Sequence, residues 1–489
     1  MRVNRGVGNL MTFKSLVQCV SCVVLLVFSG GCASSGPQRS RSFFQALEMA
    51  RAGQVDQARE AFRSACSQNS TAACFRTGRE VRIDVPLGIL QGATSDTATE
   101  VIVLTEGKTV TPQVFLFDQN QDLFMDSLTQ TVVELPGGWG KLTQVRYEGL
   151  VAGVKYQLLV VGAAGELLDG RELQTLDITK KRVSFAVASC MDNRHPQQKQ
   201  MWTELVGHEP EMIFLIGDNV YADSEVAKST PAPPDTVWKR YFETRRDLQL
   251  FKARRLIPVF AVWDDHDFGQ NDGDRTYPYR AESRKIFHAF FGSAEYPGVF
   301  DRGPGVASRL NAFGQRFFFL DDRTFRSPAG DRAGQTHFGV DQESWLFTDL
   351  FTATPVWLIS GDQFFGAYHK YESYEGRHPD SFARFIRRLK SQSSPVVFLS
   401  GDRHLSEVME IPADVLGYRS FEITSSAIHG EVYPNPWTQT PNPRQIEGVA
   451  SINNYAFIEA ESAGALQLSI KAFGPDNRRL FSRNVEIRK

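Results

Sequence analysis

The amino-acid sequence predicts an α/β fold in which two sheets lie between layers of helices, preceded by a helical hairpin and a β-sandwich. Three observations support this fold class. Five short apolar runs each end in an aspartate or a cysteine, segments with helical periodicity alternate with these runs, and a block of short β-like runs precedes them. Alternating strands and helices are typical of parallel sheets, whereas short strands between turn residues are typical of sandwiches.

The stretch Glu211–Tyr221 is the one around which the chain is organised. Its four large apolar residues, Ile213 to Ile216, predict a strand that is buried on both faces. Gly217 follows, where the missing side chain allows another group to approach the backbone closely. Asp218 and Tyr221 then stand past the carboxyl end of the strand, where open α/β sheets bind ligands. A single Gly-Asp after a strand is also typical of a plain turn or a helix cap.

The same pattern recurs four more times. Apolar runs precede Cys190, the sequence Asp264-Asp265-His266-Asp267, Asp362, and the sequence Asp402-Arg403-His404. Parallel strands in one layer would bring all five ends to one edge, and packing alone gives no reason for five repetitions. The sequence therefore predicts a polynuclear metal site.

Residues 180–489 are expected to form the domain that carries this site. Helical segments are predicted at 196–206, 235–248, 280–291, 341–351 and 380–391, and late strands at 420–424, 455–461 and 466–472. Residues 82–179 instead show β runs such as 100–104, 114–117, 143–147 and 155–160 between Gly, Asp and Asn turns. This block predicts a β-sandwich of the immunoglobulin or fibronectin kind that braces the larger domain.

The motifs at the strand ends resemble those of the alkaline phosphatase D (PhoD-like) metallophosphoesterases. The resemblance rests on Ser189-Cys190, Gly217-Asp218-Asn219-Val220-Tyr221, Trp263 to Asp267, and Ser400 to His404, in this order and spacing. It covers residues 82–489 and includes the N-terminal sandwich. It implies a two-sheet metallophosphoesterase fold and a metal-dependent phosphatase that hydrolyses small organic phosphate esters.

Cys190 and Tyr221 indicate which metal one side of the site would bind. A phenol loses its proton only near pH 10 in water, so a phenolate ligand at neutral pH requires a strong Lewis acid. Together with Asp218 and His404 they form a mixed sulfur, oxygen and nitrogen set that suits ferric iron, and the family resemblance also implies Fe3+. Alternatively, Tyr221 is a cleft tyrosine hydrogen-bonded to an acid.

The other side of the predicted site contains only oxygen donors. Asp218 is expected to bridge the two sides, and Asp265, Asp362 and Asp402 complete the set. These carboxylates suit a hard cation, and the family resemblance implies one or two Ca2+ ions. Asp362 is the least certain of these ligands, because the sequence Ser360-Gly361-Asp362 could simply end a strand.

His266 matches the position of the catalytic histidine in this class. It would protonate the departing alkoxide as a general acid while a water activated by the cations attacks phosphorus; alternatively, it is a structural imidazole beside the metals. Arg403, and with it Arg194, could bind phosphate oxygens in a bidentate manner, although surface salt bridges would explain both. Asn271, Asp272 and Asp274 are expected mainly to shape a turn-rich loop.

Residues 1–32 predict a secretory signal peptide, with a basic start and an apolar stretch of about a dozen residues. Its end resembles a bacterial lipobox, in which Cys32 carries lipid and becomes the mature N-terminus; ordinary signal cleavage is the alternative. Ala33 would favour sorting to the outer membrane. The expected location is therefore periplasmic, with a lipid anchor in the outer membrane.

Residues 33–81 predict a short tether followed by a helical hairpin. The spacing of Ala46, Ala50, Gly53, Ala58 and Phe62 resembles one Sel1-like repeat, and this resemblance implies a disulfide between Cys66 and Cys74. One repeat cannot bury its own apolar face, so the hairpin should pack on the next domain or on an unknown partner.

The composition limits the remaining choices. The formal net charge of -2 excludes a nucleic-acid binder held by bulk charge, and 489 residues are enough for several domains. Two alternatives to a phosphatase remain open. One is a phosphodiesterase or phospholipase D-like hydrolase on the same metals, and the other is a non-catalytic surface protein that binds partners through its hairpin and sandwich.

Overall fold

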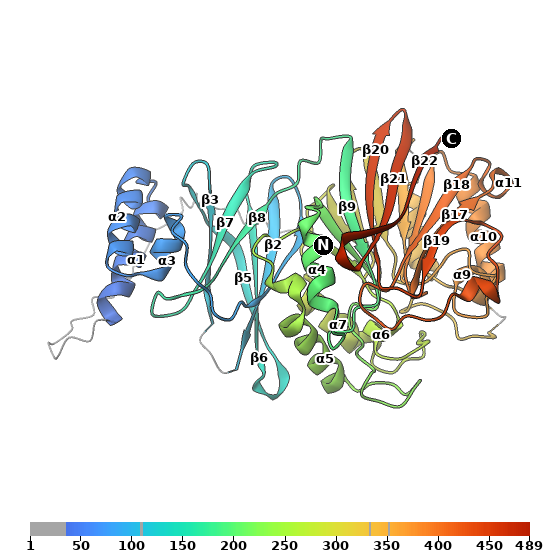
Figure 1. The fold of residues 1–489 in the computed structure, drawn as a ribbon, viewed down its shortest axis with the longest axis horizontal. Helices are drawn as coiled ribbons and strands as arrows, with labels where there is room; N and C mark the ends of the chain where they lie inside the picture. The colour runs from blue at the N-terminus through green and yellow to red at the C-terminus, as the bar shows by residue number, and fades with distance from the viewer. Residues whose placement is uncertain (1–35, 108–110, 332–333, 351–352) are drawn as a thin grey trace, which may run out of the picture.

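A computed structural model describes residues 36–107, 111–331, 334–350 and 353–489, with side chains from residue 41 onward (Figure 1). The predicted signal peptide and its lipidation site Cys32 lie outside the described residues. Within the described chain, no helix is long and apolar enough to cross a membrane. Three parts follow one another along the long axis of the molecule: a helical hairpin, a β-sandwich and a larger α/β domain.

The helical hairpin consists of α1 (Gly36–Arg51), α2 (Val55–Ser67) and α3 (Thr71–Arg76), with a left-handed Gly53 at the predicted break. A disulfide joins Cys66 to Cys74. The apolar face of the hairpin packs on the sandwich, where Phe43 and Phe62 meet Phe115 and Phe117 with ring centroids 6.1 and 5.8 Å apart. The next domain therefore covers the face that one repeat cannot bury.

The β-sandwich is built from two antiparallel four-stranded sheets, ordered β1-β2-β6-β5 and β4-β3-β7-β8. The strands are β1 (Gly88–Thr94), β2 (Ala98–Glu106), β3 (Gln113–Asp118), β4 (Phe124–Met125), β5 (Ser127–Glu134), β6 (Gly140–Glu148), β7 (Lys155–Val161) and β8 (Leu167–Gln174). Alternating side chains such as Val101, Val145, Leu116 and Leu158 fill the space between the sheets. The two β-layers are those that the sequence predicts for this block.

The α/β domain contains a six-stranded and an eight-stranded sheet, ordered β11-β10-β9-β20-β21-β22 and β12-β13-β14-β15-β16-β18-β17-β19. Its strands are β9 (Arg182–Ala188), β10 (Met212–Ile216), β11 (Val259–Val262), β12 (Phe300–Arg302), β13 (Ser308–Ala312), β14 (Gln315–Phe319), β15 (Val356–Ile359), β16 (Val396–Ser400), β17 (Leu405–Ile411), β18 (Ser420–Ser425), β19 (Gln445–Ala450), β20 (Tyr455–Ala463), β21 (Ala465–Gly474) and β22 (Arg478–Ile487). Strands β9 to β11 are parallel, and so are β14, β15, β16 and β18.

Helices flank both sheets (Figure 1). They are α4 (Gln198–Gly207), α5 (Pro234–Asp247), α6 (Asp265–Phe268), α7 (Arg280–Phe291), α8 (Val340–Thr348), α9 (Tyr374–Arg377), α10 (Pro379–Lys390) and α11 (Ala413–Leu416). Aromatic side chains pack between the sheets: Phe185 of β9 lies 5.8 Å from Phe317 of β14 and 5.3 Å from Trp357 of β15, measured between ring centroids. This arrangement confirms the predicted fold class.

One expectation needs correction. The five strands that end in candidate ligands do not lie in one layer, because β9, β10 and β11 belong to the six-stranded sheet and β15 and β16 to the eight-stranded sheet. Packing of the two sheets face to face, rather than hydrogen bonding within one sheet, brings the five ends together. Runs that are apolar on both faces do not reveal which sheet they join, since strands of either sheet are buried by the opposite sheet and by helices.

Candidate metal centre

The strand ends of the two sheets meet where three glycines leave room for them. A Cβ atom added to Gly217, which follows β10, would come within 2.6 Å of the Asp264 Cβ. A Cβ atom on Gly361, which follows β15, would lie 2.5 Å from the Asp264 Cγ, and one on Gly401 would lie 2.8 Å from the Ile216 carbonyl oxygen. The close contact between the loops of the two sheets therefore depends on the absence of side chains at these positions.

Four of the predicted ligands have left-handed backbone conformations. The φ angles are 56° at Cys190, 49° at Asp218, 59° at Asp402 and 52° at His404. Non-glycine residues in this region cost of order 1–3 kcal/mol each, and such residues cluster at functional sites. The sharp turn after each strand directs the side chain of the next residue toward the place where the loops meet.

Ligand atoms gather in four groups among the described residues, and within each group the atoms lie within 4.8 Å of one another. The groups are Cys190, Asp218 and His404; Asp218, Asp265 and His266; Asp218, Asp264 and Asp402; and Asp265, Asp272 and Glu372. Asp218 belongs to three of them, which is the position that a bridging carboxylate would occupy. The structure thus brings together six predicted site residues: Cys190, Asp218, Asp265, His266, Asp402 and His404.

Sulfur, oxygen and nitrogen donors converge on one side of Asp218. The Cys190 sulfur lies 3.4 Å from Asp218 Oδ2 and 2.9 Å from the Ser426 hydroxyl oxygen. The Tyr221 hydroxyl lies 3.4 Å from His404 Nε2, and His404 Nδ1 bonds to the Glu431 carbonyl oxygen. Because a carbonyl oxygen can only accept, Nδ1 carries the proton of neutral His404 and leaves Nε2 with a lone pair, as a metal-binding histidine requires.

Burial suppresses ionisation of these donors in the absence of a cation. It raises the pKa of the Cys190 thiol to about 11 and that of the Tyr221 phenol well above its usual value. Burial likewise raises the pKa of Asp218 far above that of a free carboxyl group, with further contributions from Cys190 and Asp265, although His266 opposes the shift. A multivalent cation would reverse these shifts, since it favours the ionised form of each donor.

Within the ligand groups, two buried carboxylate oxygens have no hydrogen-bond partner, namely Asp218 Oδ1 and Asp264 Oδ2. An unsatisfied buried acceptor costs about 1–3 kcal/mol, and more if it is charged. Both residues belong to the same group with Asp402, whose pKa is raised to about 6 by burial and by neighbouring carboxylates. Orphaned oxygens, crowded carboxylates and a neighbouring thiol fit a site for metal cations.

His266 lies at the edge of the carboxylate side. Its Nδ1 is 2.7 Å from Asp223 Oδ1, and its ring packs against Tyr221 in a tilted arrangement with centroids 4.5 Å apart. Burial lowers the pKa of His266, but the charges of Asp265, Asp218 and Asp223 outweigh burial and raise it well above its usual value. These carboxylates favour the protonated imidazole, and the contact of Nδ1 with Asp223 leaves Nε2 as the nitrogen that can act in the site.

Asp267 supports the loop that carries Asp218. Its carboxylate accepts hydrogen bonds from the backbone amides of Asn219, Val220 and Asp264 at 3.0–3.1 Å. The carboxylate thereby ties the loop after β10 to the loop after β11. The position of Asp267 next to His266 reflects this scaffolding role.

Asp362, the ligand with the plainest alternative interpretation, is not part of these groups. It lies 2.7 Å from Arg326 Nη2 and 3.1 Å from His337 Nε2, and all three side chains are buried. Arg326 and His337 together hold the pKa of Asp362 well below its usual value against the effect of burial. The structure therefore gives Asp362 a buried ion pair, whereas Asp264, whose Oδ1 pairs with the buried Arg323 guanidinium 2.6 Å away, lies in a ligand group with Asp218 and Asp402.

The two candidate phosphate-binding arginines differ. Arg194 is exposed and pairs with Asp192 at 2.9 Å, as in the surface salt-bridge interpretation. Arg403 has only 9% of its side chain exposed, its buried Nε has no hydrogen-bond partner, and its closest carboxylate contact is 4.0 Å from Asp402. Arg403 thus retains donors for an incoming anion beside the metal ligands.

Sequence reasoning missed several residues of the site. Asp223, Asp264, Ser426 and Glu372 all contact or join the groups described above. The sequence did contain a signal for Ser426. This residue directly follows the strand Ser420–Ser425, as the polar residues of the five recognised motifs follow theirs. Glu372 gave no signal, because a long loop after β15 carries it back to the site and only tertiary packing defines that path.

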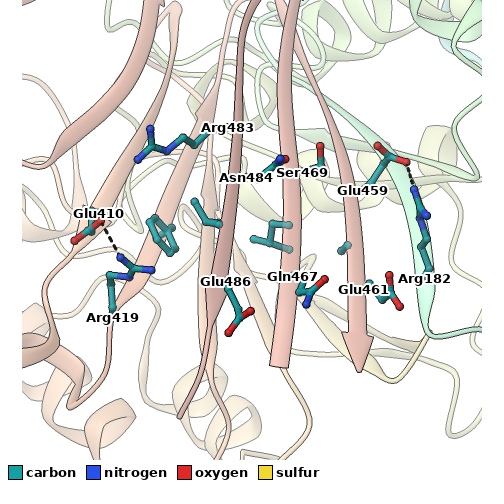
Figure 2. A pocket seen from close by; sticks show the side chains of 14 residues that line it. Arg182, Glu410, Arg419, Glu459, Glu461, Gln467, Ser469, Arg483, Asn484 and Glu486 are labelled. Atoms are coloured by element: carbon teal, nitrogen blue, oxygen red, sulfur yellow. Dashed lines mark hydrogen bonds and ion pairs between the residues drawn. The ribbon is translucent and has the colours of Figure 1, made fainter. Parts of the chain in front are cut away.

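A cavity of about 490 Å³ lies elsewhere, across β20, β21 and β22 (Figure 2). Its arginines are matched by acids: Arg182 lies 2.6 Å from Glu459, and Arg419 lies 3.9 Å from Glu410. No member of the four ligand groups lines this cavity. The cavity is therefore not the candidate active site, despite its size.

The two-sheet core with metal-ligating groups at the strand ends defines a metallophosphoesterase architecture. The structure resembles the solved structure of PhoD with a TM-score of 0.62 at 16% identity, over 83% of this chain and 94% of that one. It also resembles a purple acid phosphatase from yellow lupin (Lupinus luteus) seeds, with a TM-score of 0.55 at 12% identity, over 82% and 74% of the two chains. At these identities the likeness establishes the fold alone.

Residues 185–473 match the family model of PhoD-like phosphatases, and the chain belongs to that family. Alkaline phosphatase D of Bacillus subtilis (strain 168) is 26% identical over 296 residues, which is 51% of this chain and 49% of that protein. The chain thus aligns with about half the length of this curated relative. These findings confirm the PhoD-like resemblance, whereas the Sel1-like resemblance of the hairpin stays a prediction because the matched region begins at residue 185.

Proposed function

We propose that this protein is a metal-dependent phosphatase that releases phosphate from small organic phosphate esters. The observation that carries the proposal is the position of Asp218. This buried carboxylate, with one orphaned oxygen, lies between a Cys190–His404 group and an Asp265–His266 group. Family membership and the name of the Bacillus subtilis relative point to the same reaction class.

The donor sets support different cations on the two sides. Thiolate, phenolate and imidazole from Cys190, Tyr221 and His404 suit Fe3+, whereas the oxygen donors Asp264, Asp265 and Asp402 suit one or two Ca2+ ions. When bound, such cations supply an activated water and positive charge for the phosphate oxygens. The side chains of the protein must then orient the ester and deliver a proton to the leaving group.

His266 and Arg403 are suited to these two tasks. His266 is held by Asp223 through Nδ1, so its Nε2 proton is available to the departing alkoxide oxygen. Arg403 lies next to Asp402 and retains unpaired donors, so it would bind the phosphate oxygens and fix their orientation. Both residues follow strand ends that contribute candidate metal donors, which supports a position beside a bound phosphate.

The test combines metal analysis with turnover. Protein purified from its native compartment should contain iron and calcium, absorb visible light, and release phosphate from monoesters; chelation should abolish turnover, and adding back both metals should restore it. Parallel assays with bis-ester substrates decide between a phosphatase and a diesterase. Metal-free protein that is fully folded and hydrolyses neither class would instead support a non-catalytic binding protein.

We further propose that the protein is exported and held at the outer membrane by lipid on Cys32. The support is the sequence of residues 1–33, with its basic start, apolar stretch and small residues before the cysteine. Cys32→Ser should move the protein from the membrane fraction to the soluble or unprocessed fraction. Normal processing with unchanged membrane retention in this variant would refute the lipid anchor.

A further inference from the structure

Two exposed aromatic side chains border the candidate metal centre. Tyr371 is 52% exposed and Tyr433 is 49% exposed, and they are the aromatic members of the small set of large, exposed apolar side chains in the described chain. The other members of this set are Val85, Leu123, Leu128, Val132, Val151 and Val340. Exposed tyrosines therefore do not occur at random over the molecule but accompany this site.

Each ring contacts a residue of the same motif after β16. The Arg403 guanidinium carbon lies 4.5 Å from the centroid of the Tyr371 ring, and the His404 ring lies 5.3 Å from the Tyr433 ring. His404 belongs to the group with Cys190, and Asp402 to the group with Asp264. The two tyrosines thus stand one side chain away from the metal donors, against consecutive residues.

Local contacts fix the backbone that carries each ring, and the two side chains stay about half exposed. The Tyr371 amide donates to His369 Nδ1 at 3.2 Å, and the adjacent Glu372 binds Arg323 and Arg326 at 2.8 and 2.9 Å. The Tyr433 carbonyl accepts a hydrogen bond from the Ser451 hydroxyl at 2.8 Å. Anchored backbones with half-exposed rings form a preorganised surface, which lowers the entropy cost of binding a ligand.

The charge and chemistry around the rings indicate what they would bind. A phosphate held by Arg403 and the metals would leave its organic group to extend toward solvent, and the half-exposed rings lie against Arg403 and His404, where that group would pass. Stacking of a planar ring on an aromatic side chain contributes about 1–3 kcal/mol per base in nucleic-acid complexes. A flexible or small polar leaving group would gain little from such a surface.

We propose that Tyr371 and Tyr433 form an aromatic rim that selects phosphate esters whose leaving group carries a planar ring, such as nucleoside monophosphates. This inference rests on the proposed phosphatase function and adds its substrate class. The rim acts on the organic part of the ester and not on the reacting phosphorus. It is therefore a specificity determinant and not part of the hydrolytic machinery.

The decisive comparison uses adenosine 5′-monophosphate and ribose 5-phosphate, which release nearly the same alkoxide and differ in the base. Wild-type holoenzyme should have the higher kcat/KM on the nucleotide. Tyr371→Ala and Tyr433→Ala should each lower that value about tenfold, as expected for a loss of about 1.4 kcal/mol of stacking. Turnover of ribose 5-phosphate should change less than about twofold on the same scale.

Tyr371→Phe and Tyr433→Phe serve as matched controls, because they keep the ring and should retain the preference for the nucleotide. Val340→Ala, at an exposed position outside the site, should leave both substrates unaffected. Equal losses on both substrates in the alanine variants, or no wild-type preference for the nucleotide, would overturn the proposal.

A binding measurement separates this inference from the proposed function. Calorimetric titration of the metal-loaded protein with adenosine should give weaker binding in the alanine variants than in wild type, even if neither ester is hydrolysed. Absence of turnover with normal adenosine binding would refute the phosphatase while leaving the rim supported. Turnover without any effect of the alanine variants on adenosine binding would refute the rim alone.

Discussion

His266 Nδ1 and Asp223 Oδ1 lie 2.7 Å apart, and this hydrogen bond determines how the histidine can act. With Nδ1 held by a carboxylate, the protonated ring keeps one further N–H on Nε2 to donate. Three neighbouring carboxylates raise the pKa of His266 well above its usual value, although burial alone would lower it. Both features support the general-acid role that we propose for His266.

The leaving group provides the test of this role. His266→Asn should lower turnover of alkyl phosphates by about 10²–10⁴-fold, because positioned proton donors typically contribute this much. Nitrophenyl phosphate should lose far less, since nitrophenolate departs without a proton. Steady-state kinetics on both substrates, with metal content measured in parallel, checks the expectation; equal losses or missing metal would make His266 a positioning residue or a ligand.

Asp223→Asn is the companion change. The amide no longer provides the charge that favours imidazolium, so the pKa of His266 should fall. The basic limb of the rate profile for alkyl esters should then move to lower pH, while the profile for nitrophenyl phosphate changes little. An unshifted basic limb would show that Asp223 does not control the proton.

Tyr221 should colour the iron-loaded protein through phenolate-to-metal charge transfer. Tyr221→Phe removes the oxygen and keeps the ring that packs against His266. The visible band should shift or lose intensity while the far-ultraviolet circular dichroism, which reports the backbone, stays unchanged. A colourless, fully active wild-type enzyme with divalent ions alone would contradict phenolate ligation.

Gly217→Ala should be markedly more destabilising than a glycine substitution elsewhere. Its φ of 102° is strained for any side chain, and the added Cβ would lie 2.6 Å from Asp264. Gly464→Ala is the matched control, since its φ is 81° but nothing lies within 4 Å. We expect about 1–2 kcal/mol from left-handed strain in the control and a larger loss, with reduced metal binding, at Gly217. Similar unfolding midpoints for the two variants would contradict this packing argument.

Glu422 should make stability depend on pH. Burial raises its pKa to about 8, above the value near 4.5 of the unfolded chain. Between these values the folded state binds a proton that the unfolded state has released, so stability falls as pH rises from 4.5 to 8. Glu422→Gln should flatten this dependence, which thermal unfolding at pH 5.5 and pH 8 would reveal; equal slopes would contradict it.

The sequence by itself determined the local elements and the order of the motifs. Apolar runs such as Met212–Ile216 form strands because their composition suits a position between two layers, and a polar residue follows where each strand ends. This pattern was sufficient to predict the α/β class. It also predicted that six residues belong to one site, namely Cys190, Asp218, Asp265, His266, Asp402 and His404. The spacing of apolar positions likewise predicted helices such as Arg280–Phe291 with matching bounds.

Only the tertiary structure decided which sheet each strand joins and which acid enters the site. Asp264 and Asp362 both follow buried strands, yet Arg326 and His337 engage both oxygens of Asp362, whereas Arg323 engages only Oδ1 of Asp264 and leaves its Oδ2 orphaned. These partners come from chain segments far from the motif, so no local pattern specifies them. The same holds for the Tyr371 and Tyr433 rings, because their positions beside Arg403 and His404 depend on how two long loops pack across the strand ends.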